Sequence, residues 1–429
     1  MVFSEKTEIV LDWPNKNEIL VQDSNGKWTL DQTDILSKTR TIANLKRFDA
    51  DGLSETDSYL PTDNLIVRGN NLLVMNTLLE QFKGKVKLIY IDPPYNTGNA
   101  DFQYQDSFGH ATWLSFMKNR LEIAWQLLAD NGAIFIQTDD AEQAYLKVLC
   151  DELFGRQSFR ENIVIKSSTE SGVNAINVKR GERLFKVKEH ILFYTKSPSF
   201  RFKPFYTKTN YNFNYKYEVK KTDNQFEVKN LTKYFTNDSD LEKYCLANAA
   251  AIYSLEKNIK KAGAKFKIFA ETNKINGVVE EFINTKNQTV LVYDGGSLVP
   301  LRERIVTENG KNYFGVLASD LWVDIGTTAA TEGGIKFPNG KKPEKLLKRI
   351  IEMTTDPQDL VLDFFLGSGT TAAVAHKLGR QYVGIEQTDY KDNDCTVRLQ
   401  NVIRGDPTGI SKSVNWQGGG TFVFGELSD

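Results

Sequence analysis

The chain contains few of the residues that build disulfide or metal frameworks. Its three cysteines, Cys150, Cys245 and Cys395, are far apart in 429 residues and form no C-x-x-C pair. This spacing argues against a zinc site and against a disulfide framework. It is typical of a protein kept in a reducing compartment, so we expect a cytoplasmic protein.

Long apolar runs and an excess of charge are also absent. No stretch approaches the ~18 apolar residues of a membrane span, and the N-terminus has early acids where a signal peptide has an apolar core. The formal net charge is −1, so any nucleic-acid binding must come from local basic patches. With 40% hydrophobic residues, the chain is long enough for two or three domains, and we expect no membrane contact.

The most informative stretch is Asp92-Pro93-Pro94-Tyr95, which follows the apolar, β-branched residues 86–91. That run predicts a buried strand, and ligands bind at the carboxyl edge of open α/β sheets. The prolines stiffen the backbone and remove two N–H donors. An amino group can then donate to Asp92 and to the Pro93 carbonyl while its base stacks on Tyr95. Taken alone, the motif is explained equally well as a proline-stiffened turn.

A second motif, residues 363–371 (D-F-F-L-G-S-G-T-T), lies far downstream. It follows the strand-like residues 360–362 and precedes a predicted helix over 371–378 and a predicted strand over 381–386. This order is a strand, a glycine loop, a helix and a second strand that ends in an acid.

Individual residues of the loop limit the class of ligand that it can bind. Gly367 and Gly369 let a ligand approach the backbone, and Glu386 lies near the ~20-residue offset at which an acid meets a ribose diol. No lysine precedes Thr370, which excludes a Walker P-loop. The position of a third glycine is taken by Ala372, which disfavours a dinucleotide site.

Together the two motifs resemble those of the amino-group DNA methyltransferases that use S-adenosyl-L-methionine. D-P-P-Y is their catalytic motif, and F-x-G-x-G, here residues 365–369, is their cofactor motif. The catalytic motif comes first, as in the β group, which carries its target-recognition segment between the two. Outside roughly 196–315 the chain is similar to the modification (Mod) subunits of type III restriction-modification systems. That similarity rests on residues 64–71, 92–98, 132–140, 320–325, 342–347 and 416–420.

The resemblance implies a fold and a site. The fold class is α/β: a Rossmann-like S-adenosylmethionine-dependent methyltransferase sheet with helices on both faces, plus an inserted α+β target-recognition domain. Double-stranded DNA is the expected substrate, with a flipped adenine held by Asp92, Pro93, Pro94 and Tyr95. No metal is needed. Expected cofactor contacts are Asn70, Lys342, Asp363, Phe364, Phe365, Gly367, Ser368, Gly369, Thr370 and Glu386. A homodimer and a restriction (Res) nuclease-translocase subunit are the expected partners.

We divide the chain into an N-terminal extension (1–60), a catalytic half (61–195), a target-recognition domain (196–315) and a cofactor-binding half with a C-terminal segment (316–429). Basic residues in 167–188, and aromatic and basic residues interleaved from 200 to 221, are typical of a nucleic-acid surface. A solvated charged face, or a strand with one buried aromatic face, gives the same patterns. The predicted DNA contacts are Lys179, Arg180, Arg183, Arg201, Lys203 and Tyr206.

Periodicity and turn residues predict the other elements. We expect residues 162–165 and 190–194 to close the catalytic sheet as an antiparallel edge. The polar loop 96–110 is expected to cover the flipped base. Family members often carry an aromatic residue in the first of those edge strands, but Val164 and its neighbours replace it here. The expected helices are 72–82, 112–130, 141–154, 240–261 and 341–355, and the expected strands include 65–67, 133–137, 289–293, 313–317, 421–424 and a hairpin over 18–30.

Three alternatives stay open at this stage. The pocket could accept the exocyclic amine of cytosine, although S-P-P-Y is the commoner form in that group. Methylation of RNA or of a protein amide is a second alternative, against which the long insert between the motifs argues. The chain could also serve mainly as the DNA-reading subunit of a restriction complex.

Overall fold

The computed structural model describes residues 10–22, 28–31, 34–97, 108–169, 178–182, 184–222, 225–276, 278–308, 310–326, 331–337 and 340–428. The chain forms two compact units. Met1–Lys203 and Ser319–Asp429 make up the first unit, and Pro204–Ala318 is the second. Both sequence motifs therefore belong to the first unit, and the second unit is inserted between them.

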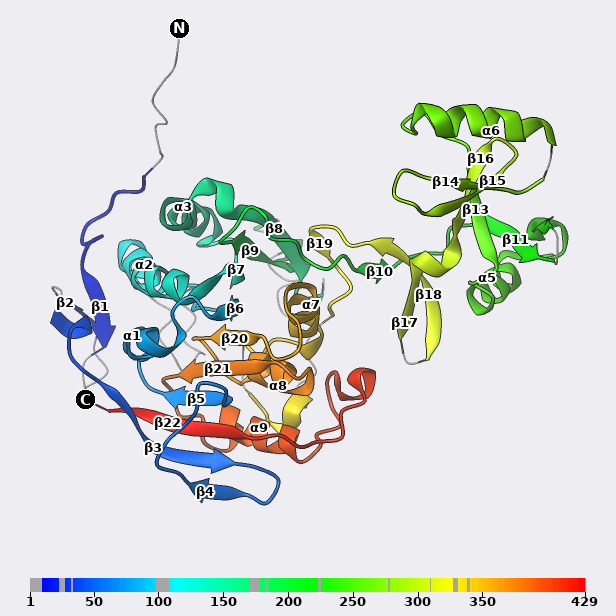
Figure 1. The fold of residues 1–429 in the computed structure, drawn as a ribbon. Coiled ribbons are helices and arrows are strands. Elements are labelled where there is room, and N and C mark those ends of the chain that lie inside the picture. The colour runs from blue at the N-terminus through cyan, green and yellow to red at the C-terminus, as the bar shows by residue number, and fades with distance from the viewer. Residues whose placement is uncertain are drawn as a thin grey trace, which may run out of the picture. The chain divides into compact units, whose positions relative to one another are not determined.

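The first unit is built on a sheet whose described strands follow the order β19-β8-β9-β7-β6-β20-β21-β5-β22-β3-β4 (Figure 1). Strands β7, β6, β20, β21 and β5 are neighbours and run parallel, so their carboxyl ends share one edge. The strands are β3 (Thr41–Phe48), β4 (Leu53–Glu55), β5 (Leu65–Arg68), β6 (Val86–Ile91), β7 (Leu128–Thr138), β8 (Phe159–Lys166), β9 (Lys188–Thr195), β19 (Leu321–Trp322), β20 (Leu360–Asp363), β21 (Gln381–Glu386) and β22 (Phe422–Ser428).

Helices cover both faces of this sheet (Figure 1). One face carries α1 (Asn71–Phe82), α2 (His110–Leu127) and α3 (Gln143–Phe154), and the other carries α7 (Glu344–Thr354), α8 (Thr370–Lys377) and α9 (Cys395–Ile403). Among the described residues no helix is both long enough and apolar enough to span a bilayer.

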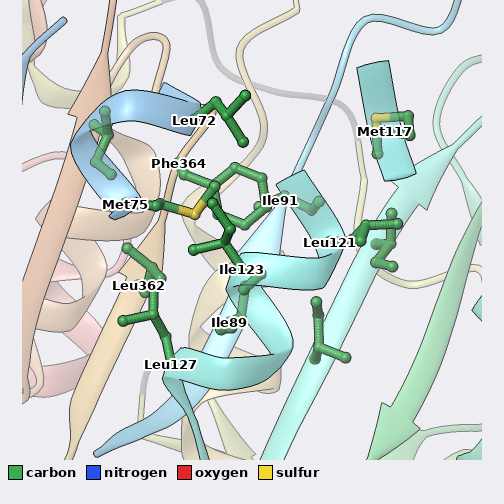
Figure 2. Packing of buried hydrophobic residues seen from close by; sticks show 14 of the residues in the cluster. Leu72, Met75, Ile89, Ile91, Met117, Leu121, Ile123, Leu127, Leu362 and Phe364 are labelled. Atoms are coloured by element: carbon green, nitrogen blue, oxygen red, sulfur yellow. The ribbon is translucent and has the colours of Figure 1, made fainter. Parts of the chain in front are cut away.

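The core beneath α1 and α2 fixes the two motifs beside each other. Leu72, Met75, Ile89, Leu121 and Phe364 are at most 1% exposed and interlock across α1, α2, β6 and the end of β20 (Figure 2). Burial of such side chains contributes about 1.5–3 kcal/mol each. In the same region β6 pairs in parallel with β20, so the segments that follow both strands emerge at the same edge.

The second unit is α+β. Six antiparallel strands form one sheet in the order β12-β11-β13-β16-β15-β14, and three more form another in the order β10-β18-β17. Its elements are β10 (Tyr206–Lys208), β11 (Tyr215–Lys221), β12 (Phe226–Asn230), α5 (Asp238–Ala247), β13 (Ile252–Glu256), α6 (Ala264–Asn276), β14 (Glu280–Ile283), β15 (Thr289–Tyr293), β16 (Gly296–Pro300), β17 (Ile305–Glu308) and β18 (Lys311–Leu317).

The predicted α/β fold class is confirmed, with helices on both faces of the sheet. The hairpin β1 (Ile19–Gln22) and β2 (Trp28–Asp31) lies outside the central sheet, as expected. Strand β9 is antiparallel to both β7 and β8, as expected. The edge of the sheet, however, is β19, which pairs in parallel with β8.

The N-terminal extension also contributes to the central sheet, because β3 pairs with β22 and brings β4 with it. One prediction about local structure is wrong. A single helix over 240–261 does not form. α5 ends at Ala247, and β13 follows as an inner strand between β11 and β16. Ile252 is fully buried there, so sheet pairing outweighs the helical periodicity of this segment.

Candidate functional site

The D-P-P-Y turn begins where β6 ends. The indole N–H of Trp113 on α2 donates to the Pro94 carbonyl at 2.8 Å, which fastens the turn to the helix that follows it. Within the described part of the chain no hydrogen bond reaches the Pro93 carbonyl. The turn therefore presents one carbonyl that is held and one that can accept from a ligand.

A cluster of polar side chains surrounds Asp92. The Tyr95 hydroxyl donates to Asp92 Oδ1 at 2.6 Å and lies 2.8 Å from Glu189 Oε2. The Lys342 ammonium lies 2.9 Å from both Glu189 Oε2 and the Tyr95 hydroxyl, and 3.3 Å from Asp92 Oδ2. The Gln137 side-chain amide donates to the same Glu189 oxygen at 2.5 Å. Asp92, Glu189 and Lys342 are all less than 20% exposed.

Burial and neighbouring charges set the protonation of this cluster. Burial raises the pKa of Asp92 to about 6, although Lys342 opposes that shift. Burial also acts to raise the pKa of Glu189, but Lys342 and three hydrogen bonds reverse the effect and lower it to about 2. The pKa of Lys342 lies above its usual range, because Asp92 and Glu189 outweigh the effect of burial. At neutral pH the cluster therefore holds two carboxylates and one ammonium.

The glycine loop is shaped by two buried carboxylates. Asp363 accepts from the Phe365 N–H at 3.0 Å and from the Thr371 hydroxyl at 2.6 Å. Glu386, at the end of β21, accepts from the Gly367 N–H at 2.7 Å. Burial raises the pKa of Asp363 to about 7 and also raises that of Glu386. Both acids thus tie the loop to the ends of neighbouring strands.

Two glycines are required for this path. Gly367 and Gly369 have φ angles of 52° and 77°, in the left-handed region that L side chains rarely adopt. A Cβ on Gly369 would also lie 2.9 Å from the Cβ of Cys395. Glycine is therefore required at both positions: each has a left-handed backbone, and a side chain at 369 would also collide with α9.

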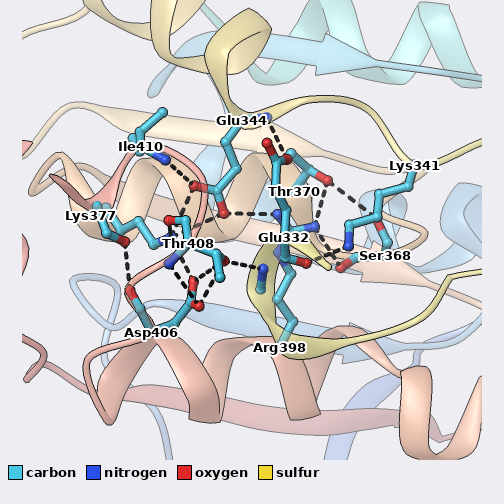
Figure 3. A network of polar contacts seen from close by, with 12 residues as sticks. Glu332, Lys341, Glu344, Ser368, Thr370, Lys377, Arg398, Asp406, Thr408 and Ile410 are labelled. Atoms are coloured by element: carbon cyan, nitrogen blue, oxygen red, sulfur yellow. Dashed lines mark hydrogen bonds and ion pairs between the residues drawn. The ribbon is translucent and has the colours of Figure 1, made fainter. Parts of the chain in front are cut away.

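A buried ionic network supports the loop from behind (Figure 3). Glu344 pairs with Lys377 at 2.9 Å and with Arg398 at 2.8 Å, and all three side chains are 0% exposed. Lys377 also pairs with Asp406 at 2.9 Å. The Arg398 guanidinium donates to the Thr370 hydroxyl at 2.7 Å, which connects the network to the first residue of α8.

Both motifs line one cavity of about 390 Å³. Its walls include the predicted residues Asp92, Pro94, Lys342, Asp363, Phe364, Phe365, Gly367, Ser368, Thr370 and Glu386. The cavity lies at the carboxyl ends of parallel strands, where α/β folds bind ligands.

Two residues predicted to bind the cofactor have other contacts in the structure. Asn70 does not line the cavity, and its side chain accepts from the Leu72 N–H as the cap of α1. The neighbouring Asn71 lines the cavity and donates to the Phe364 carbonyl at 2.7 Å. Lys342 does line the cavity, but its ammonium is directed at Asp92 and Glu189.

Sequence reasoning missed several residues of the site. Glu189 and Gln137 were not singled out, because a lone acid or amide in a strand carries no motif. The cavity walls also include the rings of Trp28, Phe108, Phe116, Phe337 and Tyr390. Aromatic residues at those positions have no spacing that distinguishes them from ordinary core residues.

The predicted DNA contacts belong to both units. Lys179 and Arg180 are exposed, and Arg183 lies outside the described residues. Arg201 donates to the backbone carbonyls of Pro198 and Phe200, and Lys203 pairs with Asp356 at 2.5 Å. Tyr206 belongs to the second unit, where the Arg304 guanidinium lies 5.5 Å from its ring.

Comparison with known proteins gives consistent matches. A family described as DNA methylase matches residues 86–392. The chain is 40% identical over 451 residues to the probable type III restriction-modification enzyme HindVI Mod subunit of Haemophilus influenzae, covering 94% of this chain and 60% of that protein. It is 26% identical over 380 residues to the EcoP15I Mod subunit of Escherichia coli, covering 75% and 57%. The chain thus spans less than two thirds of these relatives.

Among solved structures, the cytosine-N4-specific PvuII DNA methyltransferase matches with a TM-score of 0.43 and 13% identity. The match covers 82% of this chain and 90% of that protein.

Proposed function

The chain belongs to the DNA methylase family, and on that premise we propose that it is a site-specific DNA methyltransferase acting on the 6-amino group of adenine. The methyl donor would be S-adenosyl-L-methionine. The observation that carries the proposal is the single cavity shared by the D-P-P-Y turn and the glycine loop. Such a substrate would place the activity in the cytoplasm.

The cavity suits this cofactor in charge and shape. The hydrogen-bond partners of Asp363 and Glu386 are neutral N–H and O–H groups, and within the described residues no cation pairs with either carboxylate. Two such acids complement a ligand that carries positive charge and hydroxyl groups. We assign Asp363 to the ammonium group, the Gly367–Gly369 loop to the methionine end and Glu386 to the ribose hydroxyls. When bound, the cofactor supplies an electrophilic methyl group on its sulfonium.

The residues at the turn would orient the target amine. A base inside a duplex cannot be reached, so it must be flipped out at a cost of a few kcal/mol. Asp92 and the Pro93 carbonyl would each accept one amine hydrogen, while the Tyr95 ring stacks on the base. The amine lone pair would then be free to take the methyl group, the C–N bond forming as the sulfonium C–S bond breaks and leaves a thioether. The Asp92 carboxylate would accept the proton that the amine loses. Catalysis is mainly positioning and electrostatics.

The direct test is methylation of plasmid DNA by the purified protein with S-adenosyl-L-methionine, followed by mapping of the modified bases. We expect N6-methyladenine at one short sequence. N4-methylcytosine would redirect the proposal to the cytosine amine, and unmodified DNA across varied plasmids would contradict the proposed function.

Glu386→Ala is expected to weaken binding of S-adenosyl-L-methionine by about 1.5–3 kcal/mol, the range for hydrogen bonds to a charged group. Part of that loss would come from the Gly367 N–H, which loses its acceptor. Calorimetry measures the change. The matched control is Asp389→Ala, three residues further on and about half exposed, which should leave the affinity unchanged. Equal affinities for Glu386→Ala and the unmutated protein would remove Glu386 from the cofactor site.

We further infer that the second unit reads the DNA sequence. Residues 204–318 contain 17 Lys and Arg against 13 Asp and Glu, a net charge of +4, whereas the rest of the chain carries −5. Five of these lysines lie within residues 257–267, between β13 and the first turn of α6. A basic unit of this kind suits contact with phosphates.

From the similarity to Mod subunits we propose a homodimer in which one copy reads the DNA site and the other supplies the catalytic pocket. A restriction (Res) subunit would bind to this dimer. Mixing Asp92→Ala with a charge-reversed variant at the exposed Lys260 and Lys261 should restore methylation that neither variant shows alone. Activity of the mixture is compared with that of each variant at the same total concentration. A monomer by light scattering together with no rescue would exclude this assembly.

A further inference from the structure

Three segments distant in the sequence bring charged groups together at the catalytic turn. Asp92 follows β6, Glu189 is the second residue of β9, and Lys342 precedes α7. The Lys342 ammonium lies between the two carboxylates, at 2.9 Å from Glu189 and 3.3 Å from Asp92. Glu189 does not line the shared cavity, but it contacts the site through the Lys342 ammonium and the Tyr95 hydroxyl.

The two carboxylate oxygens of Asp92 have different hydrogen-bond partners. Oδ1 accepts from the Tyr95 hydroxyl at 2.6 Å, so it is already held by the motif itself. Among the described residues, Oδ2 has a single, longer contact, to the Lys342 ammonium at 3.3 Å. That ammonium has two closer partners, Glu189 and the Tyr95 hydroxyl, and it keeps both if an incoming amine displaces it from Oδ2.

We propose that Glu189 and Lys342 are positioning residues for methyl transfer: Glu189 holds the Lys342 ammonium beside Asp92, where it keeps that carboxylate ionised and Oδ2 ready for the target amine. This inference rests on the proposed function and adds two residues to its site. It predicts that substitutions of the two residues have opposite effects on the charge of Asp92.

The surroundings of Asp92 support this assignment. The charged or titratable groups that face it are Lys342, Glu189, Tyr95, Tyr90 and Asp363. Lys342 is the cation among them, and it lowers the pKa of Asp92, which burial and Glu189 raise. Loss of the ammonium should therefore make Asp92 harder to ionise. Glu189→Gln keeps a side-chain oxygen that can accept from the Lys342 ammonium, so it removes a negative charge without releasing that ammonium and should make Asp92 easier to ionise.

The experiment is the pH dependence of kcat/KM for DNA methylation by the full chain. With saturating S-adenosyl-L-methionine, so that cofactor binding at Asp363 does not limit the rate, the activity of the unmutated protein should fall below about pH 6 as Asp92 takes up a proton. Lys342→Met should move this acid limb upward by about 1–3 pH units, the effect of an opposite charge at this range. Glu189→Gln should move it downward. The double variant should lie between Lys342→Met and the unmutated protein, and Lys342→Arg should keep most of the normal profile.

Two control variants test whether a shift in the pH profile is specific to Lys342 and Glu189 or follows from removing any charged residue. Lys348→Met on the same α7 helix removes a lysine whose ion-pair partner among the described residues is the partly exposed Glu352. Glu161→Gln removes an exposed acid from the neighbouring strand β8. Neither control should move the limb. If Lys342→Met does not fold, the neutral double variant and Glu189→Gln still give the predicted order. An unmoved limb, or shifts of the same sign for the Lys342 and Glu189 variants, would overturn the proposal.

A second readout does not depend on methyl transfer. Protein labelled with [γ-13C]aspartate is titrated by NMR, and the Asp92 signal is identified by its loss in Asp92→Asn. The Asp92 titration should move in the same opposite directions in the two single variants. If the Asp92 titration shifts in opposite directions in the two variants but no DNA is methylated, the proposed function fails, while the electrostatic effect of Lys342 and Glu189 on Asp92 is confirmed. If DNA is methylated but neither readout moves, only the present inference fails.

Discussion

Replacing Asp92 by alanine is expected to lower the rate of methyl transfer by at least about 10²- to 10³-fold, the loss typical of removing one preorganised hydrogen-bonding group. In the proposed function the carboxylate is the acceptor for the target amine, and its Oδ1 is already oriented by the Tyr95 hydroxyl. Single-turnover methylation measures the rate. Because the groups assigned to the cofactor are Asp363, Glu386 and the glycine loop, calorimetry should show nearly unchanged cofactor affinity.

The matched control is Asp130→Ala, which removes an exposed acid from β7 in the same sheet and should leave the rate unchanged. A parallel fall of cofactor affinity and rate in Asp92→Ala would place Asp92 in the cofactor site. A rate within a few-fold of the unmutated protein would exclude it from catalysis.

Glu344→Gln is expected to lower the free energy of unfolding by about 3–5 kcal/mol, because it breaks two buried ion pairs at once. Glu344 balances Lys377 and Arg398, and none of the three side chains has access to water (Figure 3). With Glu344 neutralised, Lys377 keeps its ion pair with Asp406, but Arg398 loses the carboxylate with which it pairs. Urea unfolding followed by circular dichroism measures the change.

Glu352→Gln on the same helix is the control. Its ion pair with Lys348 is partly exposed, with side-chain exposures of 43% and 27%, so the expected loss is about 0–1 kcal/mol. Since Arg398 also donates to the Thr370 hydroxyl, Glu344→Gln should weaken cofactor binding as well. Equal stabilities of the two variants would show that the buried network contributes no more than a surface pair.

Elements with strong local signals were predicted from the sequence. The apolar run before Asp92 and the strand–glycine–helix pattern around Gly367 depend on residues next to each other in the chain, and both form as expected. The prediction of one helix over 240–261 was wrong because part of this segment pairs as a strand with β11 and β16. Pairing with distant strands is not visible in the local periodicity of the sequence. For the same reason the pairing of β3 with β22, some 370 residues later, could not be anticipated.

By itself the sequence determined the chemistry of the two motifs and the glycine positions of the loop, because these depend on side-chain type and backbone freedom over a few residues. Only the tertiary structure decided which other groups reach Asp92. Lys342 and Glu189 are 153 residues apart, and Glu189 and Tyr95 are 94 residues apart. They meet because β9, β7 and β6 are neighbours in one sheet, and the segment before α7 reaches the same edge. Strand order and register set such long-range contacts, and they are properties of the packed sheet that no single stretch of sequence contains.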